Sequence, residues 1–100
     1  MVQATTPTFI LTLPATVDLS QTAHIAFSLV QGRTKIKKED NQLEVNGQAV
    51  SVYLTQEDTL KFQAGQAKLQ LNWSYADGSR ACSNIIDVNI LPNLLTEVMS

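Results

Sequence analysis

The sequence has few of the side chains from which most catalytic sites are built. It contains one cysteine, Cys82, and one histidine, His24, in 100 residues. A single cysteine forms no internal disulfide, which excludes the inter-sheet disulfide of antibody domains. A catalytic thiol needs a base beside it, and His24 opens a predicted strand far from Cys82 in the sequence. We therefore predict no catalytic residues, a surface or strand-edge position for His24, and a small, half-buried filler role for Cys82.

The sequence also lacks the residue patterns from which metal and cofactor sites are built. No cysteine or histidine pair has ligand spacing, and Glu57 with Asp58 is an isolated acidic step without a calcium-binding loop. The four glycines are scattered and form no phosphate-binding loop. Asp77 and Asp87 lie on opposite arms of a predicted hairpin, and nothing in the sequence places two carboxylates across a cleft. We expect no metal, no cofactor, no small-molecule substrate and no enzymatic activity.

Charge is also sparse, at 16% of the residues, and the formal net charge is −2. A nucleic-acid-binding protein usually shows a basic face, often with aromatic residues between the cations. The only basic stretch is short, and Glu39 and Asp40 follow it at once. It consists of Arg33, Lys35, Lys37 and Lys38. We interpret this stretch as a solvated hairpin strand and expect no nucleic-acid partner.

Long apolar runs are absent, since none approaches the ~20 residues that a membrane-spanning helix needs. Segment 1–7 lacks the positive start and the apolar core of a signal peptide. We expect no membrane association, synthesis in the cytoplasm, and any extracellular role only after release by another route such as cell lysis. The apolar share of 44% is that of a folded protein, and 100 residues suffice for one domain.

Apolar and polar residues alternate with period two along most of the chain, which is typical of β-strands. The inward sets are Phe9, Leu11 and Leu13; Ile25, Phe27 and Leu29; Val50, Val52 and Leu54; and Ala67, Leu69, Leu71, Trp73 and Tyr75. Asn46 and Gly47 predict a type I′ hairpin turn. About seven short strands with turns every 8–12 residues favour an all-β fold, an immunoglobulin-like sandwich over residues 1–92. An OB-like barrel is the structural alternative.

Two irregular places interrupt this pattern. Thr55 and Asp58 form a weak capping box, which predicts one helical turn over 55–59 that crosses between the sheets, with Leu60 and Phe62 plugging the core below it. Ile85 and Ile86 are both apolar within the last strand, which predicts a bulge or burial on both faces.

Tyr53 is the one aromatic residue predicted to point outward.

The C-terminal tail, residues 93–100, has an unusual number of large apolar residues. Four of them recur at roughly helical spacing, and these are Leu94, Leu95, Val98 and Met99. The ten residues of segment 91–100 do not hold an isolated helix. The tail either folds against the domain or docks on a partner, so these four residues are the candidate partner-docking residues.

Three segments of the sequence are notable for their order and spacing: TTPTFILTLP, VSVYLTQEDTLKF and DGSRACSNIIDV. They resemble a group of small proteins encoded in the tail-gene regions of prophages from Firmicutes. Residues 54–62 match the crossover phrase of that group without a gap, and residues 83–85 match its closing phrase. The sequence departs from the group at Ala4, where glycine is usual, and over residues 33–42.

The resemblance implies a phage structural or accessory protein at the tail or baseplate, and no catalytic residues to carry over. Other phage structural proteins, or further copies of the chain, would be its partners, reached through an open sheet edge or the tail. It would be made in the host cytoplasm and then join the virion. The alternative hypothesis is a module that binds host-surface carbohydrate through the turns at Asn46–Gly47 and Asp77–Gly78.

Overall fold

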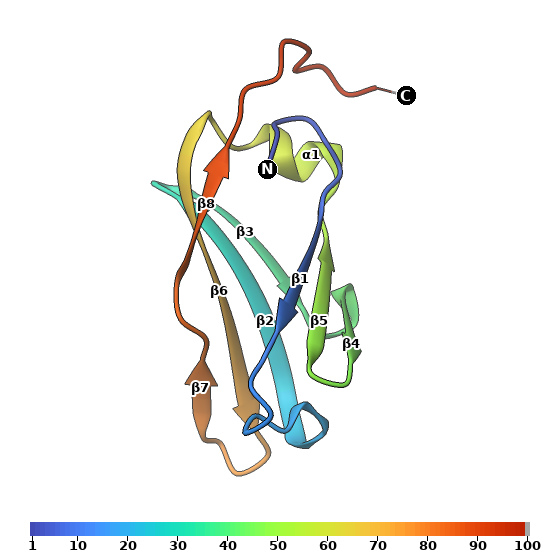
Figure 1. Cartoon of the computed structure of the whole chain (residues 1–100), viewed down its shortest axis with the longest axis vertical. Helices are drawn as coiled ribbons and strands as arrows, with labels where there is room; N and C mark the ends of the chain where they lie inside the picture. Colours follow the sequence, from blue (N-terminus) through green and yellow to red (C-terminus); the bar gives the residue numbers. More distant parts are fainter. Residues whose placement is uncertain (100) are drawn as a thin grey trace.

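The computed structural model describes residues 1–99. They form eight strands, one short α-helix and two single-turn 3₁₀ helices (Figure 1). The strands are β1 (Thr8–Thr12), β2 (Thr22–Gln31), β3 (Thr34–Glu39), β4 (Leu43–Asn46), β5 (Ala49–Tyr53), β6 (Gly65–Tyr75), β7 (Arg80–Cys82) and β8 (Ile86–Ile90). The helix is α1 (Gln56–Leu60), and the 3₁₀ turns are η1 (Leu19–Gln21) and η2 (Asp40–Gln42).

Two antiparallel sheets face each other. The smaller has the order β1-β5-β4, and the larger has the order β3-β2-β6 with β7 and β8 both on the far edge of β6. Because β7 and β8 continue one another along that edge, the eight strands fill seven strand positions. The predicted all-β sandwich of about seven strands is therefore confirmed.

The strand order departs from the immunoglobulin pattern at one strand. In a constant-type immunoglobulin domain, the second strand lies in the sheet that holds the first, fifth and fourth. Here β2 lies between β3 and β6 in the other sheet. The sandwich is thus confirmed, whereas the immunoglobulin-like order is not. The period-two alternation of apolar and polar residues predicts which residues share a face of a strand. It does not predict which strands become neighbours.

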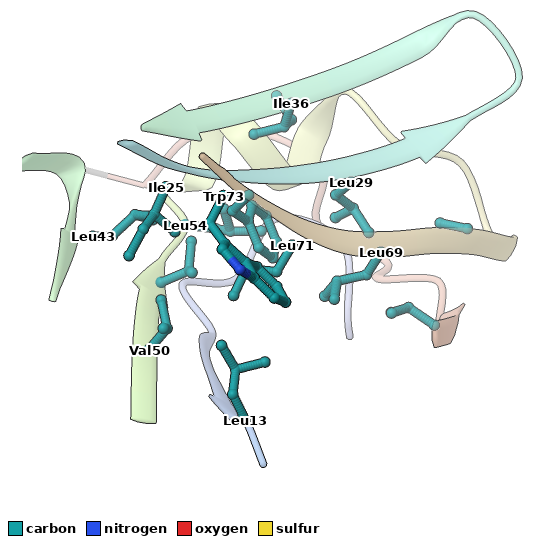
Figure 2. Close-up of a cluster of buried hydrophobic side chains, with 14 of the residues drawn as sticks. Leu13, Ile25, Leu29, Ile36, Leu43, Val50, Leu54, Leu69, Leu71 and Trp73 are labelled. Atoms are coloured by element: carbon teal, nitrogen blue, oxygen red, sulfur yellow. The ribbon is translucent and has the colours of Figure 1, made fainter. Parts of the chain in front are cut away.

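The core lies between the two inner faces and follows the predicted alternation. Phe27 of β2 is fully buried, and its ring centroid lies 6.0 Å from that of Phe9 in β1, which joins the two sheets. In Figure 2, Trp73 extends from β6 into the same space, toward which Val50 and Leu13 also point. The Trp73 indole N–H donates to the Tyr75 hydroxyl at 3.1 Å, so this buried ring keeps a partner for its polar group.

The β4–β5 hairpin forms as predicted, but its turn begins one residue later. Asn46 pairs with Ala49 in the ladder, so Gly47 and Gln48 are the central residues. Gly47 has a φ of 61°, while Gln48 is not among the residues with positive φ. Positive φ at the first central residue alone is the arrangement of a type II′ turn, so the predicted type I′ turn is wrong.

The crossover between the sheets is confirmed in detail. The Asp58 N–H donates to Thr55 Oγ1 at 3.1 Å, and the Thr55 N–H donates to Asp58 Oδ2 at 3.0 Å, which completes the capping box of α1. Phe62 is buried beneath the helix as expected, whereas Leu60 is only half-buried. Within residues 1–99, no helix has the length and the apolar character needed to cross a membrane.

The last strand is broken by a bulge. Cys82 lies opposite Asn72 and Ile86 lies opposite Leu69, so four steps along this strand match three along β6. Ser83 fills the break: its N–H donates to the Leu71 carbonyl at 2.8 Å and its hydroxyl accepts from the Leu71 N–H at 3.0 Å. The predicted bulge is confirmed.

The alternative that both isoleucines are buried is wrong, since the exposed fractions of Ile85 and Ile86 are 59% and 43%. Cys82 is also exposed, where a half-buried filler was predicted. The bulge lifts residues 83–85 out of the ladder, and β7 is an outer strand. The period-two pattern around these positions therefore did not report burial.

Candidate protein-interaction surface

The candidate docking residues lie on a segment that leaves the sandwich beside α1 (Figure 1). No helix forms over residues 91–99, in agreement with the expectation that so short a segment does not hold one. All four of the apolar side chains are exposed: Leu94, Leu95, Val98 and Met99. The structure places them together on one short segment at the end of the molecule that also carries Met1.

The backbone of this segment is nevertheless held by the domain. The Gln56 side-chain amide of α1 donates to the Met99 carbonyl at 3.0 Å and accepts from the Met99 N–H at 2.8 Å. The Asn93 side chain donates to the Gln3 carbonyl at 2.9 Å and accepts from the Leu95 N–H at 3.0 Å. Polar contacts thus position the segment while its apolar side chains stay in solvent.

One sheet edge is open as well. Among the strands of residues 1–99, β1 pairs with β5 alone, through hydrogen-bonded positions that begin at Pro7–Leu54 and end at Leu13–Gln48. Because hydrogen-bonded positions alternate in an antiparallel pair, the N–H and C=O groups of Thr8, Ile10 and Thr12 face away from β5. Within residues 1–99 these groups have no hydrogen-bond partner.

The other outer strands carry charges that discourage strand addition. Strand β3 has Lys35 and Lys37 on its outer face, β4 has Glu44, and β8 has Asp87. The far side of β8 is partly covered, since Leu91 bonds the backbone of Met1 and Gln3 on both of its polar groups. Strand β1, with the sequence TFILT, has no charge, no proline and no bulge. It is the outer strand best suited to accept a strand from a partner.

A groove of about 390 Å³ lies beside β1, between it and the bulged strand. Apolar side chains dominate its lining, among them Leu11, Leu13, Trp73 and Ile86. This groove is where the smaller sheet fails to cover the inner face of the longer β6. A strand added to β1 would lay alternate side chains against it.

The basic stretch is solvated only in part. Lys35 and Lys37 are exposed as predicted, but Lys38 points inward beside Ile36 and reaches α1. Its ammonium lies 2.9 Å from Asp58 Oδ2, and the two side chains are 18% and 12% exposed. Burial would raise the pKa of Asp58, but hydrogen bonds from Thr55 and Lys38 outweigh it and hold the pKa below its usual range.

Of the two turns considered for carbohydrate binding, the one at Asp77–Gly78 is held by hydrogen bonds within itself. The Asp77 carboxylate accepts from the Ser79 hydroxyl at 2.6 Å and the Ser79 N–H at 2.8 Å, and these bonds lower the pKa of Asp77. Of the aromatic side chains, Tyr53 is exposed as predicted. It lies on the outer face of the smaller sheet, away from the turn at Gly47, because it occupies the opposite end of β5.

The residues considered for catalysis are not brought together. Strand β6 lies between β2 and β7, so His24 and Cys82 are at least two strand spacings apart, roughly 10 Å. His24 is exposed and its Nδ1 lies 3.2 Å from Asp40 Oδ2, a pair that sequence spacing did not reveal. Within residues 1–99, no three side chains of the metal-ligating types cluster.

Comparison with known proteins completes this description. A scan against models of protein families, a search of curated protein sequences and a search of solved structures each found no match to the chain.

Proposed function

We propose that this chain is a non-enzymatic structural or accessory protein of a phage tail or baseplate, which makes protein–protein contacts through residues 94–99. The observation that carries the proposal is the exposure of four large apolar side chains on a segment whose backbone is already fixed. The resemblance of residues 54–62 to proteins from prophage tail-gene regions supports the phage assignment. Partners are other structural proteins of the particle or further copies of the chain.

The energetics suit a contact of this kind. Full burial of one such side chain contributes about 1.5–3 kcal/mol, so four contribute at most about 6–12 kcal/mol. Association costs about 4–15 kcal/mol, part of which is the ordering of flexible groups. Because Gln56 and Asn93 already hold the segment, that part of the cost is reduced here. The open edge of β1 offers a second contact through main-chain hydrogen bonds.

The proposal is tested by making the segment polar without touching the domain. In the test variant the four residues are changed together: Leu94→Ser, Leu95→Ser, Val98→Ser and Met99→Ser. We expect its thermal unfolding midpoint to match that of the original protein, because none of the four is buried. Tagged and supplied in trans during prophage induction, it should be at least about tenfold depleted in purified particles.

Thr96→Ser is the matched control, since it changes the same segment and leaves the four apolar side chains in place. It should enter particles like the original protein. Equal incorporation of the four-serine variant would contradict docking through this segment.

A further inference from the structure

A second hollow, of about 380 Å³, lies on the outer face of the smaller sheet. It falls within the size range of small-molecule sites and, unlike the groove beside β1, its lining is mostly polar. The lining residues are Thr8, Asn41, Gln42, Leu43, Glu44, Ser51 and Tyr53. They come from β1, η2, β4 and β5, so four separate segments meet there.

Tyr53 supplies an exposed aromatic ring to this hollow. The alternation of β5 turns Val50 and Val52 into the core and Tyr53 outward, opposite Thr8 on β1. Its exposed fraction is 56%, which is high for a residue whose ring carries so much apolar surface. A ring in this position offers a flat apolar face next to polar groups.

The polar groups around the ring are free to bind a ligand. Within residues 1–99, the side chains of Thr8, Asn41, Glu44 and Ser51 make no hydrogen bond. Gln42 is partly engaged: its Oε1 accepts from the Glu39 N–H at 3.0 Å. That bond fixes the orientation of the amide and leaves its two Nε2 protons available for donation.

The turn that presents Asn41 and Gln42 is held rigidly to the other sheet. Asp40, which precedes them, has a φ of 48°, a left-handed conformation that costs free energy outside glycine. Its carboxylate accepts from the Ile25 N–H at 3.0 Å, and the other oxygen lies 3.2 Å from His24 Nδ1. These bonds tie η2 to β2, so the rim of the hollow is pre-organised for a ligand.

We propose that this hollow binds a neutral hexopyranose, with the sugar ring stacked on Tyr53 and its hydroxyls bonded to the surrounding side chains. Glu44 and Asn41 accept hydrogen bonds from hydroxyl groups, and Gln42 donates. Among residues 1–99, Glu44 is the one charged residue in the lining, and no cationic side chain lines the hollow. Acidic sugars and phosphates are therefore repelled, which restricts the ligand to the neutral class.

The site is separate from residues 94–99 and does not rest on the assembly function. It also differs from the two turns that the sequence indicated for carbohydrate. A particle protein with such a site would contact a glycan through one face and its neighbours through another.

The test is an NMR titration of the full-length, ¹⁵N-labelled protein. The probes are the methyl glycosides of glucose, galactose, mannose, N-acetylglucosamine and rhamnose, each added to about 20 mM, and glucuronic acid as the anionic counterpart. We expect at least one neutral glycoside to shift the amide signals of Asn41, Gln42 and Tyr53 in a saturable manner. Glucuronic acid should shift them far less.

Two variants decide whether the ring carries the binding. Tyr53→Ala should weaken binding at least about tenfold, the loss expected when one stacking aromatic ring is removed, while Tyr53→Phe should keep it within about threefold. Ile10→Ala is the control, because Ile10 is exposed on the same face but does not line the hollow. The absence of any shift with all five glycosides would overturn the proposal, as would binding that survives Tyr53→Ala.

A truncated chain without residues 94–100 keeps this inference distinguishable from the assembly proposal. It should bind the glycoside with unchanged affinity and still fail to enter particles. Loss of glycoside binding on truncation would show that the hollow is not the site.

Discussion

The ammonium of Lys38 lies 2.9 Å from Asp58 Oδ2, the same oxygen that accepts the Thr55 N–H in the capping box of α1. One carboxylate thus closes the first turn of the crossover helix and also ties that helix to β3. Both side chains are mostly shielded from water. This contact joins the edge of the larger sheet to the segment that connects the two sheets.

Loss of Lys38 should weaken the fold more than loss of its neighbour does. Lys38→Ala leaves the shielded Asp58 carboxylate without its cation, and we expect the free energy of unfolding to fall by about 1–3 kcal/mol. Lys37→Ala removes a cation whose pair with Glu39 is half-exposed, and should change it by less than about 0.5 kcal/mol. Urea denaturation at neutral pH measures both. Equal effects of the two substitutions would argue against a structural role for Lys38.

Acid should destabilise the protein through Asp58. Its pKa is lower in the folded chain than the value of 3.8 that it has when unperturbed. A carboxyl group of this kind stabilises the fold above its unfolded pKa, and the stabilisation is lost as the pH falls through the folded pKa. We expect the free energy of unfolding to be nearly constant from about pH 7 to pH 5 and to decline below about pH 4.

Asp58→Asn tests this assignment, because an amide does not titrate. The variant should be less stable at pH 7 and should lose less stability on acidification than the original protein. Asp40 and Asp77, whose pKa values are also lowered by hydrogen bonds, from Ile25 and Ser79 respectively, should supply the remaining decline. A decline of unchanged size in the variant would assign the acid sensitivity to other groups.

The capping box itself should contribute a measurable amount. Thr55→Ala removes the side-chain oxygen that accepts the Asp58 N–H, and we expect it to lower the free energy of unfolding by about 1 kcal/mol. Thr55→Ser keeps an oxygen in the same place and should restore most of that loss. If serine were as destabilising as alanine, the methyl group and not the hydrogen bond would be responsible.

The bulge in the last strand should depend on Ser83. Its hydroxyl accepts the Leu71 N–H where a backbone carbonyl would otherwise do so. Ser83→Ala leaves that N–H without a partner and should cost about 1–3 kcal/mol. Ser74→Ala, on the half-exposed outer face of β6, is the control and should be nearly neutral. Amide hydrogen exchange at Leu71 provides a local readout, and exchange as slow as in the original protein would contradict this account.

The sequence predicted the parts of the fold that local patterns determine. Alternation in β2 and β6 identified their buried faces, and Thr55 with Asp58 predicted the helical crossover. What it missed depends on neighbours in space. The place of β2 beside β6 is not encoded in its own period. The partner of Lys38 is Asp58, which comes from a segment twenty residues later along the chain.

The candidate interaction surface was likewise predicted from the sequence only in part. Apolar spacing identified Leu94 and Val98 as candidates, and the structure places them on an exposed segment. Gln56 and Asn93, which hold that segment, gave no signal, because isolated amides carry no spacing pattern. The free edge of β1 was equally hidden, since an edge is defined by the absence of a neighbouring strand.

The assembly function proposed above makes the chain a structural component of a phage particle. Quantitative mass spectrometry of gradient-purified particles tests it most directly, with the cleared lysate measured in parallel. We expect the protein to be present at a fixed ratio to the major tail proteins across independent preparations and gradient fractions. A protein that is abundant in the lysate and absent from the particles would contradict it.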